Sequence, residues 1–174
     1  MPSSIILVAG DRQDNLKTQF IHSFASVANN GTCTYSIKET SQTYSVGLRD
    51  STGMEEATPI NALNYYGVNG VIFIFNYDNE SSFTSIQNHW LNEAKTNAQN
   101  CPVLIVGVES NQMKVNKEKV LKFATEHQCQ YAGFSDKNKN EVHAQLSFFA
   151  RNKKFLPLEQ SGKKNQRDSS RLMA

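Results

Sequence analysis

The chain has 174 residues, of which 39% are hydrophobic and 20% charged, and its formal net charge is +2. This length and composition are typical of one globular domain, and so mild a charge argues against a nucleic-acid-binding protein. Three cysteines, odd in number and widely spaced, predict reduced thiols in a cytosolic protein and argue against a disulfide scaffold or a zinc site.

The first third of the chain alternates between strand and helix signals. Ser4–Ala9 is a continuous apolar run, which is typical of a strand buried on both faces. Apolar residues at helical spacing predict a helix over Asn15–Ala28, which Asn29-Asn30-Gly31 would stop. Thr32–Glu39 and Gln42–Leu48 then read as two strands joined by a tight turn.

The middle of the chain holds the clearest strand. Pro59–Tyr66 reads as a short helix, and Gly70–Phe75 (GVIFIF) as a fully buried strand. Ser81 and Ser82 are predicted to cap the next helix. The predicted core face of that helix consists of Phe83, Ile86, Trp90, Leu91 and Ala94.

The last third repeats the pattern. Pro102–Gly107 and Gln130–Phe134 are predicted strands, and Asn116–Gln128 and Asn140–Phe155 are predicted helices. The inward residues of these helices are predicted to be Val120, Leu121, Ala124, Val142, Leu146, Phe149 and Ala150. We therefore expect one domain over residues 1–157 and a polar, flexible tail over residues 158–174.

A strand, a loop and a helix at the start of the chain occupy the place of a phosphate-binding loop. Such a loop requires G-x-x-x-x-G-K-[ST], with backbone N–H groups and the lysine on phosphates and the hydroxyl on Mg²⁺. Gly10, Lys17 and Thr18 are present, but one extra residue separates Gly10 from Lys17. Leu16 replaces the second glycine, and Asp14 adds negative charge. Two interpretations stay open: retained phosphate contact through Lys17 and Thr18, or a plain strand-to-helix turn with Lys17 on the surface.

The stretch from Leu48 to Phe83 carries a family resemblance. It runs strand, Asp50-Ser51-Thr52-Gly53, loop, Tyr65-Tyr66-Gly67, apolar strand, acidic turn and amphipathic helix. In this order it resembles the switch II half of a Ras/Rab-like small GTPase, and the resemblance covers roughly residues 3 to 155. It implies an α/β Ras-like P-loop domain with a six-stranded, mostly parallel sheet, one antiparallel strand from Thr32–Glu39, and about five flanking helices.

The resemblance also assigns roles around the phosphates. Asp50 would reach Mg²⁺ through water and Gly53 would meet the γ-phosphate, so Thr18 and Asp50 are the predicted metal residues. The family's water-orienting glutamine is replaced by Met54. A thioether cannot hold a water in line for attack. We therefore predict no catalytic residue and no efficient intrinsic hydrolysis of GTP to GDP.

The family reads guanine with N-K-x-D, and here that motif has become Val108-Glu109-Ser110-Asn111. A carboxylate accepts from two guanine donors, whereas the amide of Asn111 offers one acceptor. The family's S-A-K, whose backbone supports the guanine oxygen, resembles Ser135-Asp136-Lys137. These positions, Asn111, Ser135 and Lys137, complete the predicted nucleotide site, and an ordinary polar loop is the other interpretation of each motif.

The region that would form switch I is short. Thr32 and Thr34 are the nearest candidates for its Mg²⁺-binding threonine, and the sequence assigns neither. Partners of small GTPases dock on the switch helix and on the neighbouring edge strands. Tyrosines on the predicted edge hairpin, Tyr35 and Tyr44, are candidates for contact with protein partners. Plain exposure to solvent is the other interpretation of these two side chains, and the sequence leaves both open.

The lipid anchors usual in this family are expected to be absent, because Pro2 replaces the myristoylated glycine and no cysteine lies near the C-terminus. No apolar run reaches the roughly 18 to 20 residues of a membrane span. These features predict a cytoplasmic protein, brought to the cytoskeleton or cilium, if at all, by partners.

Three functional interpretations follow. The first is a pseudo-GTPase that serves as an interaction module in a hetero-complex, such as a trafficking or cytoskeletal/ciliary assembly. The second is an atypical but active switch that binds GTP or GDP with Mg²⁺ and needs a partner for hydrolysis. The third is an unrelated flavodoxin-like protein, which would need a different phosphate loop that the sequence does not show.

Overall fold

A computed structural model describes residues 4–12, 15–25, 27–29, 32–51 and 62–158. Within these residues the strands form one sheet of seven in the order β2-β3-β4-β1-β5-β6-β7. The strands are β1 (Ser4–Ala9), β2 (Val27–Asn29), β3 (Thr32–Lys38), β4 (Thr43–Asp50), β5 (Gly70–Asn76), β6 (Val103–Val108) and β7 (Gln130–Phe134). The helices are α1 (Leu16–His22), the 3-10 helix η1 (Ala62–Tyr65), α2 (Glu80–Ser85), the π-helical turn η2 (Ile86–Trp90), α3 (Leu91–Asn97), α4 (Lys117–Glu126) and α5 (Asn140–Asn152).

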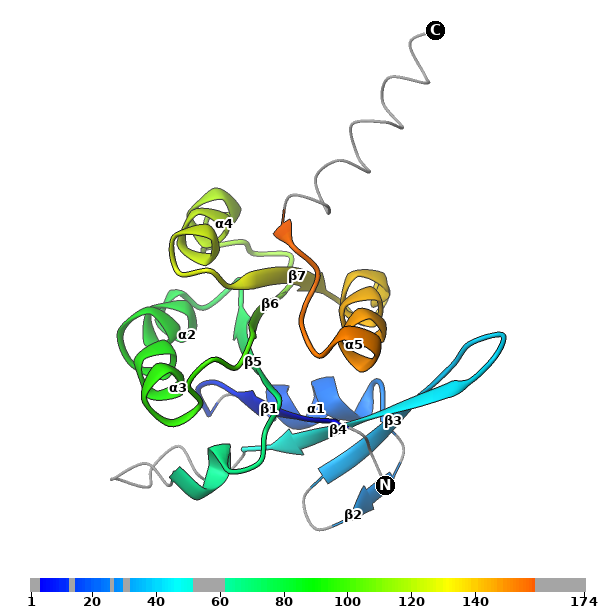
Figure 1. The fold of residues 1–174 in the computed structure, drawn as a ribbon. Coiled ribbons are helices and arrows are strands. Elements are labelled where there is room, and N and C mark those ends of the chain that lie inside the picture. Colours follow the sequence, from blue (N-terminus) through cyan, green and yellow to red (C-terminus); the bar gives the residue numbers. More distant parts are fainter. Residues whose placement is uncertain (1–3, 13–14, 26, 30–31, 52–61, 159–174) are drawn as a thin grey trace, which may run out of the picture.

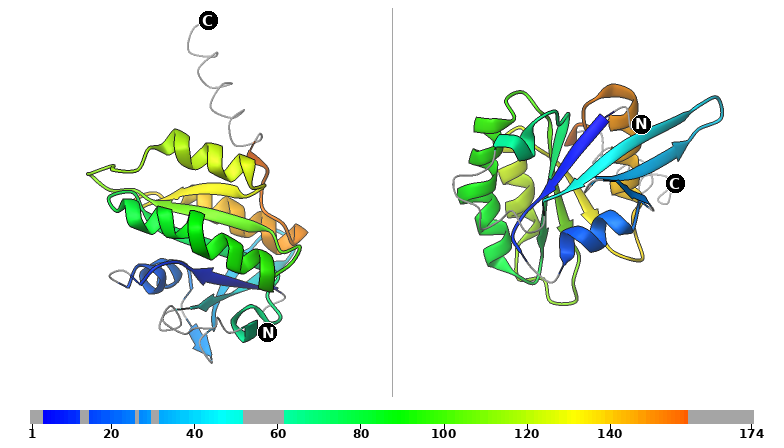
Figure 2. Two further views of the ribbon diagram at one scale, coloured as in Figure 1. Left: turned by 90° about the vertical axis from the view of Figure 1, so that its left-hand side faces the viewer. Right: turned by 90° about the horizontal axis from the view of Figure 1, so that it is seen from below.

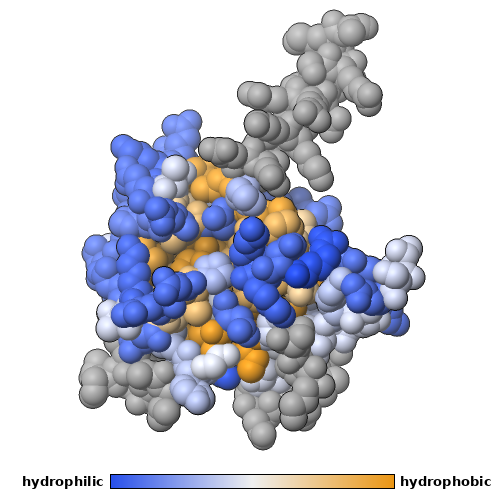
Figure 3. Space-filling model, in the orientation of Figure 1, coloured by the Kyte–Doolittle hydropathy of each residue, from blue (hydrophilic) through white to orange (hydrophobic). Residues whose placement is uncertain are grey.

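Helices cover both faces of the sheet and produce two apolar cores (Figures 1 and 2). One core lies under α2, α3 and α4, and the other under α1 and α5. Because β1 and β5 are central and covered on both sides, almost all of their residues are buried, as continuous apolar runs predict. In the view of Figure 3, hydrophobic side chains show between the hydrophilic outer surfaces of the helices.

The predicted Ras-like α/β architecture is confirmed, with all six predicted strands in place. β1 pairs in parallel with β4 and β5, and β6 pairs in parallel with β5 and β7. β3 runs antiparallel to β4, as predicted for Thr32–Glu39. The additional strand β2 pairs antiparallel with the first three residues of β3, so β3 is not itself the edge there.

The long first helix predicted over Asn15–Ala28 is wrong in its second half. α1 ends at His22, where the Ser23 hydroxyl donates to the Phe20 carbonyl at 2.6 Å and competes with the helical pattern. Val27–Asn29 belongs to β2 instead. An Asn-Gly pair follows in the sequence, and Asn-Gly between two strands signals a hairpin more strongly than a helix stop.

One continuous helical segment runs from α2 through η2 to α3, and its start differs from the prediction. Asn79 is the N-cap, since its side chain accepts from the Ser81 N–H, while Ser81 and Ser82 lie inside the helix. The predicted core face is confirmed as buried, and the π-helical turn ends at Trp90. π-Helical turns within α-helices are frequent at functional sites.

The remaining predicted helices are present but shorter than predicted. α4 buries Val120 and Ala124 as expected, together with Phe123, while Leu121 is only partly buried. α5 buries its whole predicted face. Of the predicted helix Pro59–Tyr66, the described part forms η1, and the tail beyond residue 158 lies outside the described residues. Among described residues, no helix is long and apolar enough to cross a membrane.

Candidate functional site

The carboxyl ends of the parallel strands meet at one edge of the sheet, where ligands bind in open α/β folds. There the first turn of α1 approaches the end of β4. The Thr18 hydroxyl donates a hydrogen bond of 2.6 Å to Asp50 Oδ2. The structure therefore brings together the two predicted metal residues, which offer one hydroxyl and one carboxylate oxygen.

Lys17 is buried and turned onto the preceding loop. Its side chain is 3% exposed, and its ammonium donates to the carbonyls of Gly10 at 2.8 Å and Asp11 at 3.0 Å. The interpretation of Lys17 as a surface residue is therefore wrong. A buried cation is costly unless it is well solvated by polar groups, so the loop carbonyls hold this positive charge at the position that the resemblance gives to phosphate.

In the described part of this loop, Gly10 and Asn15 have positive φ. Gly10 has φ +145°, and a Cβ there would lie 2.5 Å from the Ile74 carbonyl oxygen of β5. Gly10 is therefore required by its close approach to β5, whatever it contributes to phosphate contact. Asn15 adopts the left-handed conformation (φ 57°) directly before α1, a role that asparagine tolerates better than most residues.

Asp11 joins the loop to the helical segment on the other side of the sheet. Its two carboxylate oxygens accept from Trp90 Nε1 at 2.9 Å and from the Ser85 hydroxyl at 2.7 Å. Trp90 is buried, as expected, but its indole also fixes the loop. No sequence motif indicates this connection, although a buried tryptophan N–H needs an acceptor and an acidic residue beside a strand end is a candidate.

The loop after β6 places Asn111 and Glu109 in exposed positions. The Glu109 carboxylate lies over the edge strand β7, since a Cβ built on Gly133 would meet Glu109 Oε1 at 3.3 Å and Glu141 Oε2 at 3.4 Å. Glu141 itself accepts from the Gly133 N–H at 2.6 Å. Both carboxylates add to the effect of burial in raising the pKa of Tyr131, so this end of the site is acidic.

Ser135 and Lys137 lie in a tight turn between β7 and α5. The Ser135 N–H donates to the Asn138 carbonyl at 3.0 Å, and the Asn138 N–H donates back to Ser135 O at 3.1 Å and Oγ at 3.0 Å. The Ser135 amide is thus used within the turn, and Lys137 is exposed. This geometry matches the alternative interpretation of Ser135-Asp136-Lys137, which is an ordinary turn before a helix.

Two residues that the family resemblance assigned next to the γ-phosphate and the attacking water lie outside the described residues. They are Gly53 and Met54. The switch I candidates Thr32 and Thr34 are part of β3, in register with Arg49 and Gly47 of β4.

The described residues fit only part of a guanine nucleotide with Mg²⁺. Thr18 and Asp50 would hold the metal ion, and the Lys17 ammonium would neutralise phosphate charge. Bound Mg²⁺ would itself offset phosphate charge. The base side fits poorly, because the position of the guanine-reading carboxylate is taken by Asn111 and the nearby Glu109 is turned to β7.

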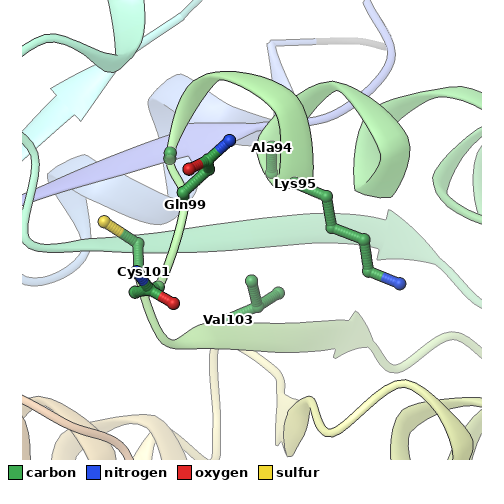
Figure 4. A pocket seen from close by; sticks show the side chains of 7 residues that line it. Ala94, Lys95, Gln99, Cys101 and Val103 are labelled. Atoms are coloured by element: carbon green, nitrogen blue, oxygen red, sulfur yellow. The ribbon is translucent and has the colours of Figure 1, made fainter.

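A separate hollow lies at the opposite, amino-terminal end of the sheet, between the end of α3 and the start of β6 (Figure 4). It measures about 290 Å³ and is lined by Ala94, Lys95, Cys101 and Val103 among others. The Cys101 thiol donates to the Val68 carbonyl at 3.4 Å, and burial raises its pKa. A thiol with a raised pKa is a poor nucleophile, and we assign no chemistry to this hollow.

Comparison with known proteins agrees with the fold. The sequence model of the Ras family matches residues 13–154. The Ras-related protein Rab-13 of Canis lupus familiaris is 32% identical over 106 residues, which are 59% of this chain and 52% of that protein. The Rho-related GTP-binding protein RhoH of Bos taurus is 31% identical over 71 residues, 41% of this chain and 37% of that protein.

A more distant relative, the Ras-related protein Rab-5B of Plasmodium falciparum (isolate 3D7), is 26% identical over 102 residues, 58% of this chain and 49% of that protein. The chain thus spans about half the length, or less, of the curated relatives it matches. The match over residues 13–154 nevertheless covers most of the domain described above. This chain belongs to the Ras family of small GTPases.

Proposed function

We propose that this Ras-family chain is a pseudo-GTPase: it binds guanine nucleotide weakly or not at all and acts as a protein–protein interaction module. The main observation in its favour concerns the residues at the position of the guanine-reading motif. Asn111 stands in place of the guanine-reading aspartate, and Glu109 lies over Gly133 of β7. An unmet buried donor costs about 1–3 kcal/mol, so guanine preference falls by one to two decades from this site alone.

The phosphate loop supports the same proposal. Leu16, the first residue of α1, replaces the glycine that would let the backbone approach phosphate closely. The loop is one residue longer than the motif, and Asp14 adds a negative charge to it. Met54 replaces the glutamine that orients the attacking water. Each change removes a different contact, which fits a scaffold kept after its switching chemistry was lost.

We place the partner surface on the switch side of the molecule and on the β3–β4 hairpin. The Arg49 guanidinium donates to the carbonyls of Asn64 and Tyr66, both at 3.1 Å, and so holds the segment that carries Tyr66. Tyr66 is 79% exposed, which makes it the best contact for a partner. The hairpin extends beyond the body of the sheet (Figure 2).

The two hairpin tyrosines contribute less free surface than their sequence positions suggest. Tyr35 is half-buried, packs against Phe24, and shares a hydrogen bond of 2.5 Å with His143 of α5. Tyr44 is also half-buried. We therefore propose that the hairpin contacts partners through its exposed turn, as part of a cytoplasmic hetero-complex. A trafficking or cytoskeletal/ciliary setting rests on analogy with the fold family.

An active switch is the second candidate, and the Thr18–Asp50 hydrogen bond favours it. With Lys17 beside them, these residues keep the metal and phosphate half of the site. Such a switch would hydrolyse GTP only with groups from a partner, since a supplied arginine is worth about 10³–10⁵ in rate.

Thermal unfolding with Mg²⁺ and millimolar GTP, GDP, ATP or ADP tests the proposal, with Thr18→Ala as the control variant. A ligand at 100 times its Kd adds about 2.7 kcal/mol, which moves a domain of this size by several degrees. We expect wild type and Thr18→Ala to show the same shift of under about one degree with every nucleotide. A shift of several degrees with GTP and GDP that Thr18→Ala abolishes would establish the active switch instead.

A further inference from the structure

Three buried polar side chains face one small cavity beside the candidate site. Ser51, Tyr65 and Glu93 line it and are 5%, 4% and 7% exposed. Ser51 Oγ, the Tyr65 hydroxyl and Glu93 Oε2 make no hydrogen bond within the described residues. Buried polar atoms without partners are rare and costly, so three around one space require an explanation.

The nearest side chains do not satisfy the hydrogen-bonding capacity of these three oxygens. His89, whose side chain is half-exposed, places its Nε2 3.2 Å from the buried Glu93 Oε2, but without hydrogen-bond geometry. Burial raises the pKa of Glu93, and the nearby Tyr65 hydroxyl offsets only part of that rise. The two groups nevertheless fail to form a well-aligned hydrogen bond. A small molecule in the cavity that forms hydrogen bonds to both groups would satisfy the hydroxyl and the carboxylate oxygen.

We propose that this cavity holds one ordered water molecule, shared by Ser51, Tyr65 and Glu93. The space is about 10 Å³, close to the least that one water needs. Two hydroxyls that can donate or accept and one carboxylate that accepts match the two donors and two lone pairs of water. A sodium-sized or larger cation takes about six or more oxygen ligands, and three side-chain oxygens are too few.

The water would connect three elements that no direct hydrogen bond between these side chains joins. Ser51 follows Asp50 at the end of β4, Tyr65 ends η1, and Glu93 lies on α3. Trp90, which also lines the cavity, holds Asp11 of the loop. The site thus links the strand that carries Asp50 to the helical segment that anchors the loop.

Single and double substitutions test the shared water. If the three oxygens are truly unsatisfied, Ser51→Ala and Tyr65→Phe each remove an unmet group and stabilise the protein. If a water bridges them, each substitution leaves the water short of a partner and lowers the folding equilibrium constant about 5- to 10-fold. The control is Tyr66→Phe, an exposed neighbour expected to change nothing.

We expect destabilisation by both single variants in urea unfolding, and a double variant that loses less than the product of the two single effects. In ¹⁵N-labelled protein, a water-to-amide NOE at Ser51 should be present in the wild type and absent from the double variant. Unchanged or increased stability, additive effects, or no such NOE would overturn the proposal. So would stabilisation by NaCl or KCl beyond that by choline chloride at equal ionic strength, which would indicate a bound cation.

Discussion

The Thr18 hydroxyl and Asp50 Oδ2, 32 positions apart in the chain, lie 2.6 Å apart and share a hydrogen bond. The bond joins the first turn of α1 to the end of β4, so it fixes the helix against the strand that begins the D-x-x-G segment. The two predicted metal residues therefore lie together in a chain whose predicted base-reading residues differ from the family motif.

Removing the hydroxyl at Thr18 should destabilise the domain. A hydrogen bond to a charged group is worth about 1.5–3 kcal/mol, so Thr18→Ala should lower the free energy of unfolding by about 2 kcal/mol in urea titrations. Thr18→Ser keeps the hydroxyl and should recover most of the loss. The control is Thr125→Ala, whose exposed hydroxyl bonds only within α4 and should change stability by less than about 0.5 kcal/mol.

Breaking the Asp11 contacts should release the loop from the helical segment. Asp11→Ala removes the acceptor of both Trp90 Nε1 and the Ser85 hydroxyl, and we expect a loss of about 2–3 kcal/mol. Because Trp90 is the single tryptophan of the chain, its fluorescence emission should change in the folded variant. An exposed acidic residue, Asp136, provides the control, and wild-type emission and stability in Asp11→Ala would contradict the described anchor.

Two glycines with positive φ among the described residues, Gly10 and Gly67, should differ in their tolerance of a methyl group. Gly10→Ala brings a Cβ within 2.5 Å of the Ile74 carbonyl oxygen, so we expect a loss of about 3 kcal/mol from overpacking and backbone strain together. At Gly67 (φ +73°) nothing lies within 4 Å of the added atom, and only the strain of about 1–2 kcal/mol applies. Equal losses of unfolding free energy for Gly10→Ala and Gly67→Ala in denaturant titrations would contradict this explanation. Glycine at position 10 would then not be required by its close approach to β5.

Stability should fall in alkaline solution because of Cys129. Burial raises the pKa of this thiol from 9.0 to about 11, so the folded state binds the proton more tightly than the unfolded state does. The resulting stabilisation is fully present below pH 9 and is lost as pH rises through about 11, by about 3 kcal/mol for two pKa units.

Urea unfolding of wild type and Cys129→Ala between pH 8 and pH 11.5 measures this loss. The variant will be less stable throughout, because it loses buried volume, but its stability should decline less steeply. Parallel declines of the two proteins would mean that Cys129 keeps an ordinary pKa, and that the decline comes from other groups whose pKa burial raises, such as Cys33, Cys101 and the buried tyrosines.

Sequence patterns predicted the sheet well, because buried parallel strands need long apolar runs. GVIFIF and the run before Gly107 fall within one residue of β5 and β6. The helix boundaries were less predictable. The end of α1 depends on the hydrogen bond from the Ser23 side chain, and the start of α2 depends on Asn79, not Ser81, being the N-cap. Hydrophobic periodicity contains no information on either.

Contacts of the candidate site were predictable only where a motif named both partners. Thr18 and Asp50 were both assigned through the family resemblance, and they do meet. Asp11 and Trp90 are 79 positions apart and share no motif, and the cavity between Ser51 and Glu93 arises from the packing of separate elements. Such contacts follow from the tertiary structure, since no local pattern encodes them.

The nucleotide content of the purified protein tests the central claim most directly. Denaturing the protein, separating the released small molecules by ion-exchange chromatography and quantifying them at 260 nm gives the moles of bound nucleotide per mole of chain. Because the guanine-reading residues and the phosphate loop both differ from the family motifs, we expect far less than one mole of nucleotide per mole of chain. Close to one equivalent of GDP or GTP would contradict the account and identify the chain as a working nucleotide-binding switch.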